Sequence, residues 1–483
     1  MGKDIGLFIG DPLSKNPTRR DLLRTGVAVG LSAAILPPLR APASAESTDE
    51  IKRLPGVPFA LSEAFTNDPE VVHSVPDVVD IAAVADRYGN SILYTLSVDS
   101  HGSTVSKTGL DPTTDKYTPF AQCAAPKVDI PTTITTLPRH DANSAETVLV
   151  GGFDLDDRDR SRNAALSLSN DGGNSFKHMP IWTARGEIIE GSVLQLERIP
   201  DTNKAIFAIG FPDEASRQYG IFDANTGEYN LIESGYDLPV LDDLSIDQSG
   251  NRVLGMGRLL RGNEVGLPHQ VGIVDFVLDL NTADIVSYDV HHEYLLGLDD
   301  IALKRDRGGT PRTLYALKAD IGEGFIADRT ISEVDMQNPG TIKTIEYGLP
   351  LDDILFADFA EGSELKQSIA RHRRAHVVLQ CLKPTENGVW VAGRAFSDNG
   401  NLPFAAFISS PIGVNSVRDA DVFSFTPVHV FPSGIKTDPI FVKMGDHKGV
   451  VFGLRTAGIS LFLTDDKDEP LPGAPVLYNV RTK

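Results

Sequence analysis

A repeated pair of aspartates is the clearest chemical signal in the chain. The phrase L-D-D followed by an aliphatic residue occurs three times, and an acidic residue can be placed before an apolar stretch in four further segments. The carboxylates concerned are Asp80, Asp129, Glu190, Asp243, Asp300, Asp353 and Asp438. Carboxylates held close together raise one another's pKa values unless something offsets their charge. A divalent cation would do so, most naturally Ca²⁺, which takes oxygen ligands.

Basic residues recur in a second set of segments, and they could offset the same charge. The segments "GMGRLL", "ALKAD", "AGRAF" and "GLRTA" each carry one, and two loops add histidines. The residues are Arg258, Lys318, Arg394, Arg455, His101 and His269. Arginines at matching positions can bind a carboxylate through two parallel hydrogen bonds. The predicted cluster could therefore hold a cation, hold an anion, or pair internally.

The segments that carry these residues belong to a repeat. After each L-D-D come a polar turn, an apolar strand, a loop, another strand, a second turn and a fourth strand. Seven such units of four strands follow one another at intervals of roughly 50 residues. Sheets of four strands repeated at this period predict an all-β fold, a β-propeller of seven blades, with six or eight as alternatives. Consecutive β-sandwiches would not give hairpin pairs at one period.

The propeller determines where the acidic residues should lie. The first strand of each blade begins at the mouth of the central channel, so the sequence predicts a ring of carboxylates there. Asp353 is kept only as a ligand-binding candidate, because an insertion at 358–376 that is compatible with a helix follows it. The other six are candidate calcium ligands. The competing interpretation is structural: each aspartate caps its own turn, and the basic residues form salt bridges with the ring.

The first 45 residues are expected to be a removable export signal. They contain Arg19 and Arg20, an apolar stretch from Gly26 to Leu36, and a small-residue A-S-A ending at Ala45. This pattern resembles a bacterial twin-arginine signal, which directs proteins that are already folded out of the cytoplasm. The mature chain, 46–483, is expected to be one propeller domain working in the periplasm or outside the cell.

An eight-residue segment resembles a motif of one propeller family. Residues 169–176 read S-N-D-G-G-N-S-F, which is similar to the Asp box of sialidase-type propellers, with Ser175 for threonine and Phe176 for tryptophan. In that family the motif is a structural turn away from the active face. The resemblance supports the fold and implies no reaction.

The net charge of the chain limits the kinds of partner that we expect it to bind. Because the signal carries six basic and three acidic residues, its removal takes the net charge from −21 to −24. So acidic a surface disfavours nucleic acid and anionic membranes as partners. No later segment is long and apolar enough to span a bilayer. Cys123 and Cys381 are expected to be buried thiols, with one disulfide as the alternative. Trp182 and Trp390 are expected in the core or packed between blades.

Two functions from different classes follow from these residues. The first is an exported propeller that binds a small-molecule, glycan or protein ligand at the acidic mouth of its channel, with Ca²⁺ as the candidate cofactor. The second is a carbohydrate-active hydrolase or lyase acting on an acidic sugar, with arginines on the sugar carboxylate and two ring carboxylates as acid and base or nucleophile. No motif decides whether the chain is an enzyme.

Overall fold

The computed structural model describes strands and short connections between residues 77 and 478. The described residues are 77–99, 102–111, 116–118, 120–138, 145–156, 161–211, 217–247, 249–262, 268–291, 298–305, 311–319, 329–335, 342–345, 376–385, 388–397, 400–409, 425–430, 437–454, 458–471 and 476–478. The predicted signal lies outside them. So does the predicted insertion, apart from its last residue, His376, which begins a strand.

The described strands form seven four-stranded antiparallel sheets and one two-stranded hairpin. Blades 1 and 2 are β1 (Asp77–Ala85), β2 (Ser91–Asp99), β3 (Gly102–Thr108) and β6 (Ala121–Gln122), then β7 (Ile130–Leu137), β8 (Thr147–Leu155), β9 (Arg162–Ser169) and β10 (Lys177–Pro180). Blades 3 and 4 are β11 (Ser192–Arg198), β12 (Lys204–Gly210), β13 (Gln218–Asp223) and β14 (Glu228–Leu231), then β15 (Val240–Ile246), β16 (Arg252–Gly262), β17 (Pro268–Asp279) and β18 (Ile285–His291).

The remaining blades continue the same order along the chain. Blades 5 and 6 are β19 (Leu298–Arg305), β20 (Pro311–Ala319), β21 (Arg329–Asp335) and β22 (Ile342–Ile345), then β23 (His376–Pro384), β24 (Gly388–Ser397), β25 (Gly400–Ser409) and β26 (Phe425–Val430). Blade 7 is β27 (Ile440–Met444), β28 (His447–Leu454), β29 (Gly458–Thr464) and β30 (Val476–Tyr478), and the hairpin is β4 (Leu110–Asp111) with β5 (Lys116–Tyr117).

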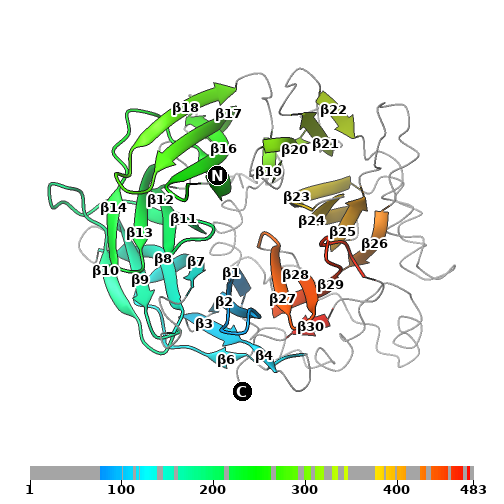
Figure 1. The fold of residues 1–483 in the computed structure, drawn as a ribbon, viewed down its shortest axis with the longest axis horizontal. Helices are drawn as coiled ribbons and strands as arrows, with labels where there is room; N and C mark the ends of the chain where they lie inside the picture. The colour runs from blue at the N-terminus through cyan, green and yellow to red at the C-terminus, as the bar shows by residue number, and fades with distance from the viewer. Residues whose placement is uncertain are drawn as a thin grey trace, which may run out of the picture.

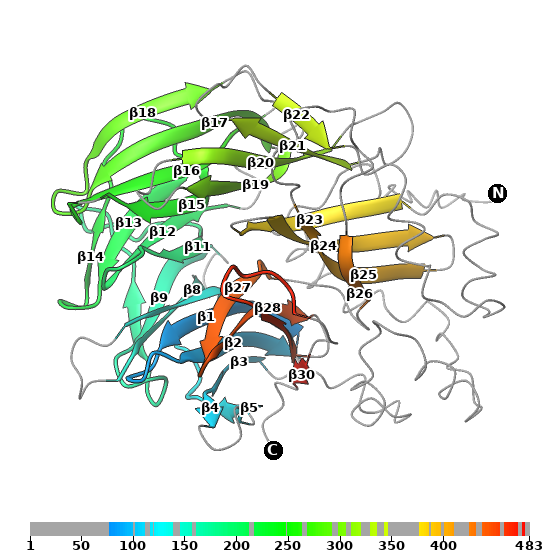
Figure 2. The same cartoon turned by 45° about the vertical axis from the view of Figure 1, so that its right-hand side comes forward.

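The sheets are arranged as a ring, with the first strand of each blade nearest the centre and the later strands toward the rim (Figure 1). The all-β propeller predicted from the repeat is therefore confirmed. Blade 7 lies beside blade 1 in both views (Figure 2). There the Lys443 amide donates to the Ser91 hydroxyl and the Gly445 amide donates to the Asn90 side chain, at 2.9 and 2.7 Å. The described strands of blade 1 all come from the N-terminal part of the chain, and those of blade 7 all come from the C-terminal part. The two blades therefore meet through contacts between neighbouring sheets.

Apolar side chains fill the spaces between neighbouring sheets. Leu149 and Leu166 of blade 2 pack with Phe207 of blade 3, and Ala165 on the other face of β9 packs with Tyr94 of blade 1. Successive residues of a strand alternate between these two interfaces, because side chains point to opposite faces of a sheet. Both faces of a blade are therefore buried over most of its length, as a propeller requires.

A β-bulge recurs in the first strands. In six of the seven described first strands the pairing with the second strand shifts by one residue. The residues at the shift are Val79, Thr132, Leu194, Asp242, Asp299 and Gln380. In β27 the described pairing is regular. A bulge bends its strand and redirects the adjoining side chains, and in two L-D-D phrases the bulged residue is the first aspartate.

Candidate functional site

The antiparallel order of each blade gives the ring two distinct faces. The turns between first and second strands, and between third and fourth strands, lie on one face, here called the turn face. The loops between second and third strands and the connections between blades lie on the opposite face, here called the mouth face. The predicted site residues belong to the mouth face, so the two faces are described separately.

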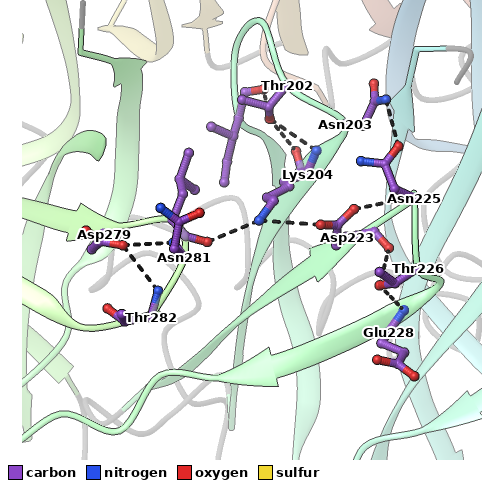
Figure 3. Close-up of polar contacts among 12 residues, drawn as sticks. Thr202, Asn203, Lys204, Asp223, Asn225, Thr226, Glu228, Asp279, Asn281 and Thr282 are labelled. Atoms are coloured by element: carbon purple, nitrogen blue, oxygen red, sulfur yellow. Dashed lines mark hydrogen bonds and ion pairs between the residues drawn. The ribbon is translucent and has the colours of Figure 1, made fainter. Parts of the chain in front are cut away.

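Aspartates on the turn face are engaged by backbone amides. The carboxylates of Asp86, Asp247, Asp279 and Asp465 each accept at least two amide hydrogen bonds from the residues that follow. A hydrogen bond from the Ser249 hydroxyl, followed by backbone amides, holds the pKa of Asp247 below its ordinary value. The Asn281 and Thr282 amides do the same to the pKa of Asp279 (Figure 3).

Lys204 joins blades 3 and 4 on the turn face. Its ammonium group lies 3.4 Å from the Asp223 carboxylate and donates to the Leu280 carbonyl at 3.1 Å (Figure 3). Asp223 also accepts the Asn225 amide at 2.8 Å. These contacts close the turns and tie neighbouring blades together, and they leave this face with a structural role.

The turn at Ser169–Phe176 is the most heavily bonded of these turns. Asp171 accepts the Ser169 hydroxyl, the Ser175 hydroxyl and the Ser175 amide at 2.7, 2.6 and 2.9 Å. Burial would raise the pKa of Asp171, but the hydrogen bonds from Ser175 and Ser169 outweigh it and hold the pKa below its ordinary value. Gly173 has a φ of 87°, a conformation that favours glycine, and a Cβ there would meet the Cys123 sulfur at 2.6 Å.

On the mouth face the predicted carboxylates take two different positions relative to the first strands of the blades. Asp80, Asp243 and Asp300 directly follow the bulge of their first strand. The other described members lie outside the first strands: Asp129 precedes β7, Asp438 precedes β27, and Glu190 lies beside β9. The prediction of one ring at one level is therefore wrong in its alignment, because Asp129, Glu190 and Asp438 precede the first strands at whose starts they were placed. Asp353 lies outside the described residues.

Asp80 joins blades 1 and 2. Only 6% of the residue is exposed. Its carboxylate accepts the Ile81 amide at 2.9 Å and, from blade 2, the Thr133 hydroxyl at 2.8 Å and the Ile134 amide at 3.0 Å. A carboxylate engaged by three donors across a blade interface matches the structural interpretation of the acidic set.

In the next two blades, a residue at the bulge or directly after it makes a similar link. Thr132, at the bulge of blade 2, donates to the Val193 carbonyl of blade 3. Gln195, which follows the bulge of blade 3, donates to the Leu241 carbonyl at 2.7 Å and accepts the Leu241 amide at 3.1 Å. The bulge therefore turns a polar side chain toward the first strand of the next blade in three successive blades.

Arg258 is paired with the first aspartate of an L-D-D phrase. Its guanidinium donates to both oxygens of Asp242, at 2.9 and 2.7 Å, and the two side chains are 15% and 5% exposed. A bidentate pair with so little exposure has its charge satisfied within blade 4. This pairing disfavours the use of Arg258 as a clamp for the carboxylate of an acidic sugar.

For the other basic candidates, the structure gives only the position of the residue in the strand pairing. Arg394 pairs with Val378, one residue before the pair at the bulge, which is the position that Arg258 takes opposite Val240. Lys318 instead pairs with Leu298, the position of Gly257. The predicted equivalence therefore holds for Arg394 and is wrong by one residue for Lys318. His269 lies in β17, and His101 and Arg455 lie outside the described residues.

A second group of side chains gathers on the mouth face of blade 2, and sequence analysis singled out only part of it. Asp154, Asn163 and Glu190 face one another in a row across three antiparallel segments, through the β8–β9 pairing and an isolated bridge. Ile188 lies two residues from Glu190 and bridges to Trp182. Directly paired residues, and residues two apart on a strand, share one face of a sheet.

His178 completes this group from β10. Its Nε2 lies 2.6 Å from an Asp154 oxygen, and the other Asp154 oxygen accepts the Asp129 amide at 3.2 Å. The Asp129 carboxylate in turn accepts the Leu155 amide at 3.0 Å. We call this surface the blade-2 shelf, and its residues are Asp154, Asn163, His178, Trp182, Ile188 and Glu190.

The shelf is exposed because of the blade beside it. It continues the sheet face that buries Ala165 against blade 1, since Pro180 pairs with Ala165 and lies two residues from both His178 and Trp182. The fourth strand of blade 1, however, is only Ala121–Gln122. The connection that follows it reaches this face, where the Lys127 amide donates to the Ser167 hydroxyl at 2.8 Å, but Trp182 and Ile188 are still 43% and 40% exposed.

The predictions for the two tryptophans can be compared with the structure. Trp390 is buried, as expected, among Phe407, Phe452 and Phe462. Trp182 is exposed, so its placement in the core is wrong; the short neighbouring strand that exposes it left no signal in the sequence.

Both cysteines are free. Cys381 is buried and Cys123 is partly buried, and burial raises the Cys123 pKa to about 11. The thiol prediction therefore holds in place of the disulfide.

Within the described ranges, no three His, Cys, Asp or Glu side chains are grouped so that they could hold a metal ion. Calcium therefore stays a prediction from the sequence. The same ranges contain no helix long and apolar enough to cross a membrane.

Comparisons with known proteins identify no family for the chain. No family model and no curated protein matches the chain. Among solved structures, hydrazine synthase of Kuenenia stuttgartiensis is 12% identical over 81% of this chain and 96% of that chain, with a TM-score of 0.46. The β-propeller domain of the Trilobed protease from Pyrococcus furiosus is 9% identical over 82% and 98%, with a TM-score of 0.39, and the Dos1 propeller is 10% identical over 79% and 81%, with a TM-score of 0.36. Likeness at these identities concerns the fold alone.

Proposed function

We propose that this chain is an exported β-propeller protein that binds a ligand or partner on its mouth face. The export part rests on the twin-arginine pattern and places the protein in the periplasm or outside the cell. The binding part rests chiefly on the blade-2 shelf. There an exposed tryptophan and isoleucine lie beside carboxylates, whereas Asp80, Asp242 and Arg258 are engaged in structural contacts.

The shelf has the composition of a recognition surface. Exposed aromatic side chains provide large contact areas at low entropic cost, and tryptophan is enriched where binding energy concentrates. The described part of the turn face also exposes an aromatic residue, Tyr88, but that ring lies under the Arg87 guanidinium at 4.6 Å. Trp182 has no such partner among the described ring and cation contacts and does not appear in the buried core.

We also propose that residues 169–176 form an Asp box of the kind found in sialidase-type propellers. The bonds that Asp171 makes to Ser169 and Ser175 support this, as does the burial of Phe176 between blades 1 and 2. Its role is to hold a turn, and it brings no sialidase activity with it. The pairing of Arg258 with Asp242 gives the acidic-sugar enzyme no support.

Tryptophan fluorescence tests the binding proposal directly. The chain has two tryptophans, and Trp390 is 1% exposed, so quenching by acrylamide reports on Trp182. The purified protein is titrated with calcium chloride, a neutral hexasaccharide, an acidic oligosaccharide and short peptides of either charge. We expect at least one of these probes to protect Trp182 from quenching, and a Trp182→Phe variant to lose the signal. Unchanged quenching with every probe would overturn the proposal.

A further inference from the structure

We infer that the blade-2 shelf binds a basic peptide segment of a partner protein, one that combines lysine or arginine with aliphatic residues. The inference rests on the proposed function and names the chemical class of the partner. It depends on two independent features of the shelf that lie on one sheet face. One is an exposed apolar pair, and the other is a row of acidic and polar groups in which Glu190 is exposed and Asp154 and Asn163 are half-buried.

The apolar pair supplies the contact area. Trp182 and Ile188 are cross-strand neighbours in a short hairpin, closed by the Thr183 and Gly186 amides, which donate to the Glu187 and Thr183 carbonyls. Directly opposed side chains on one face lie about 5 Å apart, so the pair presents one continuous apolar surface. An apolar surface flanked by polar groups marks a protein contact more often than an isolated exposed side chain does.

The polar row supplies the preference for charge. Asp154, Asn163 and Glu190 occupy neighbouring strands, which are about 4.8 Å apart. The row therefore spans roughly 10 Å, a length that an extended peptide covers with three to four residues. Asp154 faces His178, whereas Glu190 is exposed and makes no side-chain hydrogen bond or ion pair with the described residues.

The electrostatic field of the whole protein also favours a basic partner. The chain carries a net charge of −21, and the six shelf residues include two carboxylates, Asp154 and Glu190, and no lysine or arginine. A field of this sign speeds the approach of cations and repels acidic segments. A basic segment with aliphatic residues fits both features, whereas a neutral sugar would use the tryptophan and gain nothing from the charge.

The ordered edge of the shelf makes the binding surface rigid. The Trp182 amide donates to the Tyr229 hydroxyl at 2.8 Å, and that hydroxyl donates to the Pro180 carbonyl at 3.2 Å. Tyr229 belongs to β14 of blade 3 and packs against the core between blades 2 and 3. The hairpin that carries the apolar pair is thus held by a neighbouring blade, which reduces the entropy lost on binding.

The test uses the synthetic peptide KLKKLK-amide as the probe. The acidic peptide ELEELE-amide and a neutral hexasaccharide are measured separately, as representatives of the other ligand classes. Binding to the purified protein is followed by the fluorescence of Trp182 and by calorimetry, in 50 mM and 200 mM salt. We expect KLKKLK to bind, to bind several-fold more weakly at the higher salt, and ELEELE not to bind.

Variants locate the binding. We expect Trp182→Ala to weaken KLKKLK binding about tenfold or more, measured by calorimetry, because a central tryptophan often dominates an interface. Glu190→Gln should weaken it about two- to fivefold. The matched controls on the turn face are Glu228→Gln and Tyr88→Ala, both at exposed residues, and they should leave binding unchanged. The thermal midpoint of each variant shows whether it is folded.

Each outcome decides something different. If the hexasaccharide binds at Trp182 and KLKKLK does not, the peptide inference is wrong and the proposed function stands. If KLKKLK binds equally well to the wild type, Trp182→Ala and Glu190→Gln, it is attracted by net charge alone and the shelf assignment is wrong. If no probe protects Trp182, both the inference and the proposed function are wrong.

Discussion

Aspartates on the two faces of the ring are used in different ways. On the turn face, Asp247 and Asp279 are partly exposed, and their oxygens accept amides of their own turns. On the mouth face, Asp80 and Asp242 are buried and bind groups on other strands, while Glu190 on the blade-2 shelf is exposed. The comparison teaches that an acidic repeat is no guide to a binding site until the hydrogen-bond partners of each carboxylate are known.

Loss of Arg258 should have the largest effect on stability. Arg258→Ala leaves the Asp242 carboxylate 5% exposed without its bidentate partner. We expect a loss of about 3–5 kcal/mol in the free energy of unfolding, measured by urea denaturation. The double variant Asp242→Leu with Arg258→Met should recover most of that loss. A single variant as stable as the wild type would show that the pair carries no structural weight.

Asp80 should come next. Asp80→Ala removes the acceptor of three hydrogen bonds, two of them from blade 2, and leaves the donors buried. We expect a loss of about 3 kcal/mol, measured in the same way. The matched control is Asp446→Ala, at an exposed residue of the turn face, which should change stability by less than about 0.5 kcal/mol. Equal effects from the two substitutions would remove the distinction between buried and exposed aspartates.

Asp171 should have a smaller effect that depends on pH. Asp171→Ala removes bonds from a turn at the surface, so we expect a loss of about 1–2 kcal/mol at pH 7. Because the pKa of Asp171 is lowered from 3.8 in the folded protein, its contribution is complete above that pH and is lost as the pH falls below it. Unfolding of the wild type and the variant between pH 7 and pH 2.5 should therefore converge at the acid end. A constant gap would mean that the neutral side chain holds the turn equally well.

The smallest effect on stability belongs to the blade-2 shelf. Glu190→Gln should change the free energy of unfolding by less than about 0.5 kcal/mol, because the carboxylate is exposed. The same substitution should weaken peptide binding, so stability and binding separate at this residue. A thermal midpoint that falls as far as that of Asp80→Ala would place Glu190 with the structural carboxylates.

The sequence predicted the fold through features that are local. Turn residues such as those around Asp247 and Asp279 read directly as turns, and the period of the strands predicted the propeller. The site depended on register. Blade 5 has a second pairing shift, between Lys304 and Arg305, that blade 4 lacks, and Lys318 takes the position of Gly257 and not that of Arg258. A one-residue shift moves a side chain to the other face of a sheet.

The shelf could be predicted only in part, and the reason differs from the register error at Lys318. Glu190 was identified, but it was assigned to the start of a first strand, and the bridge to Asn163 shows that it lies beside β9. Trp182 was assigned to the core or to packing between blades. Its exposure follows from the shortness of β6 in another blade, a tertiary fact that no motif near Trp182 records.

Hydrogen–deuterium exchange with and without KLKKLK-amide tests the central claim most directly, because it reports every segment at once. The account predicts slower exchange in segments 153–156, 162–164 and 181–191, which carry the shelf, and unchanged exchange in the turns at Asp247 and Asp279. Protection confined to the turn face, or to the first strands around Asp80 and Asp243, would contradict it.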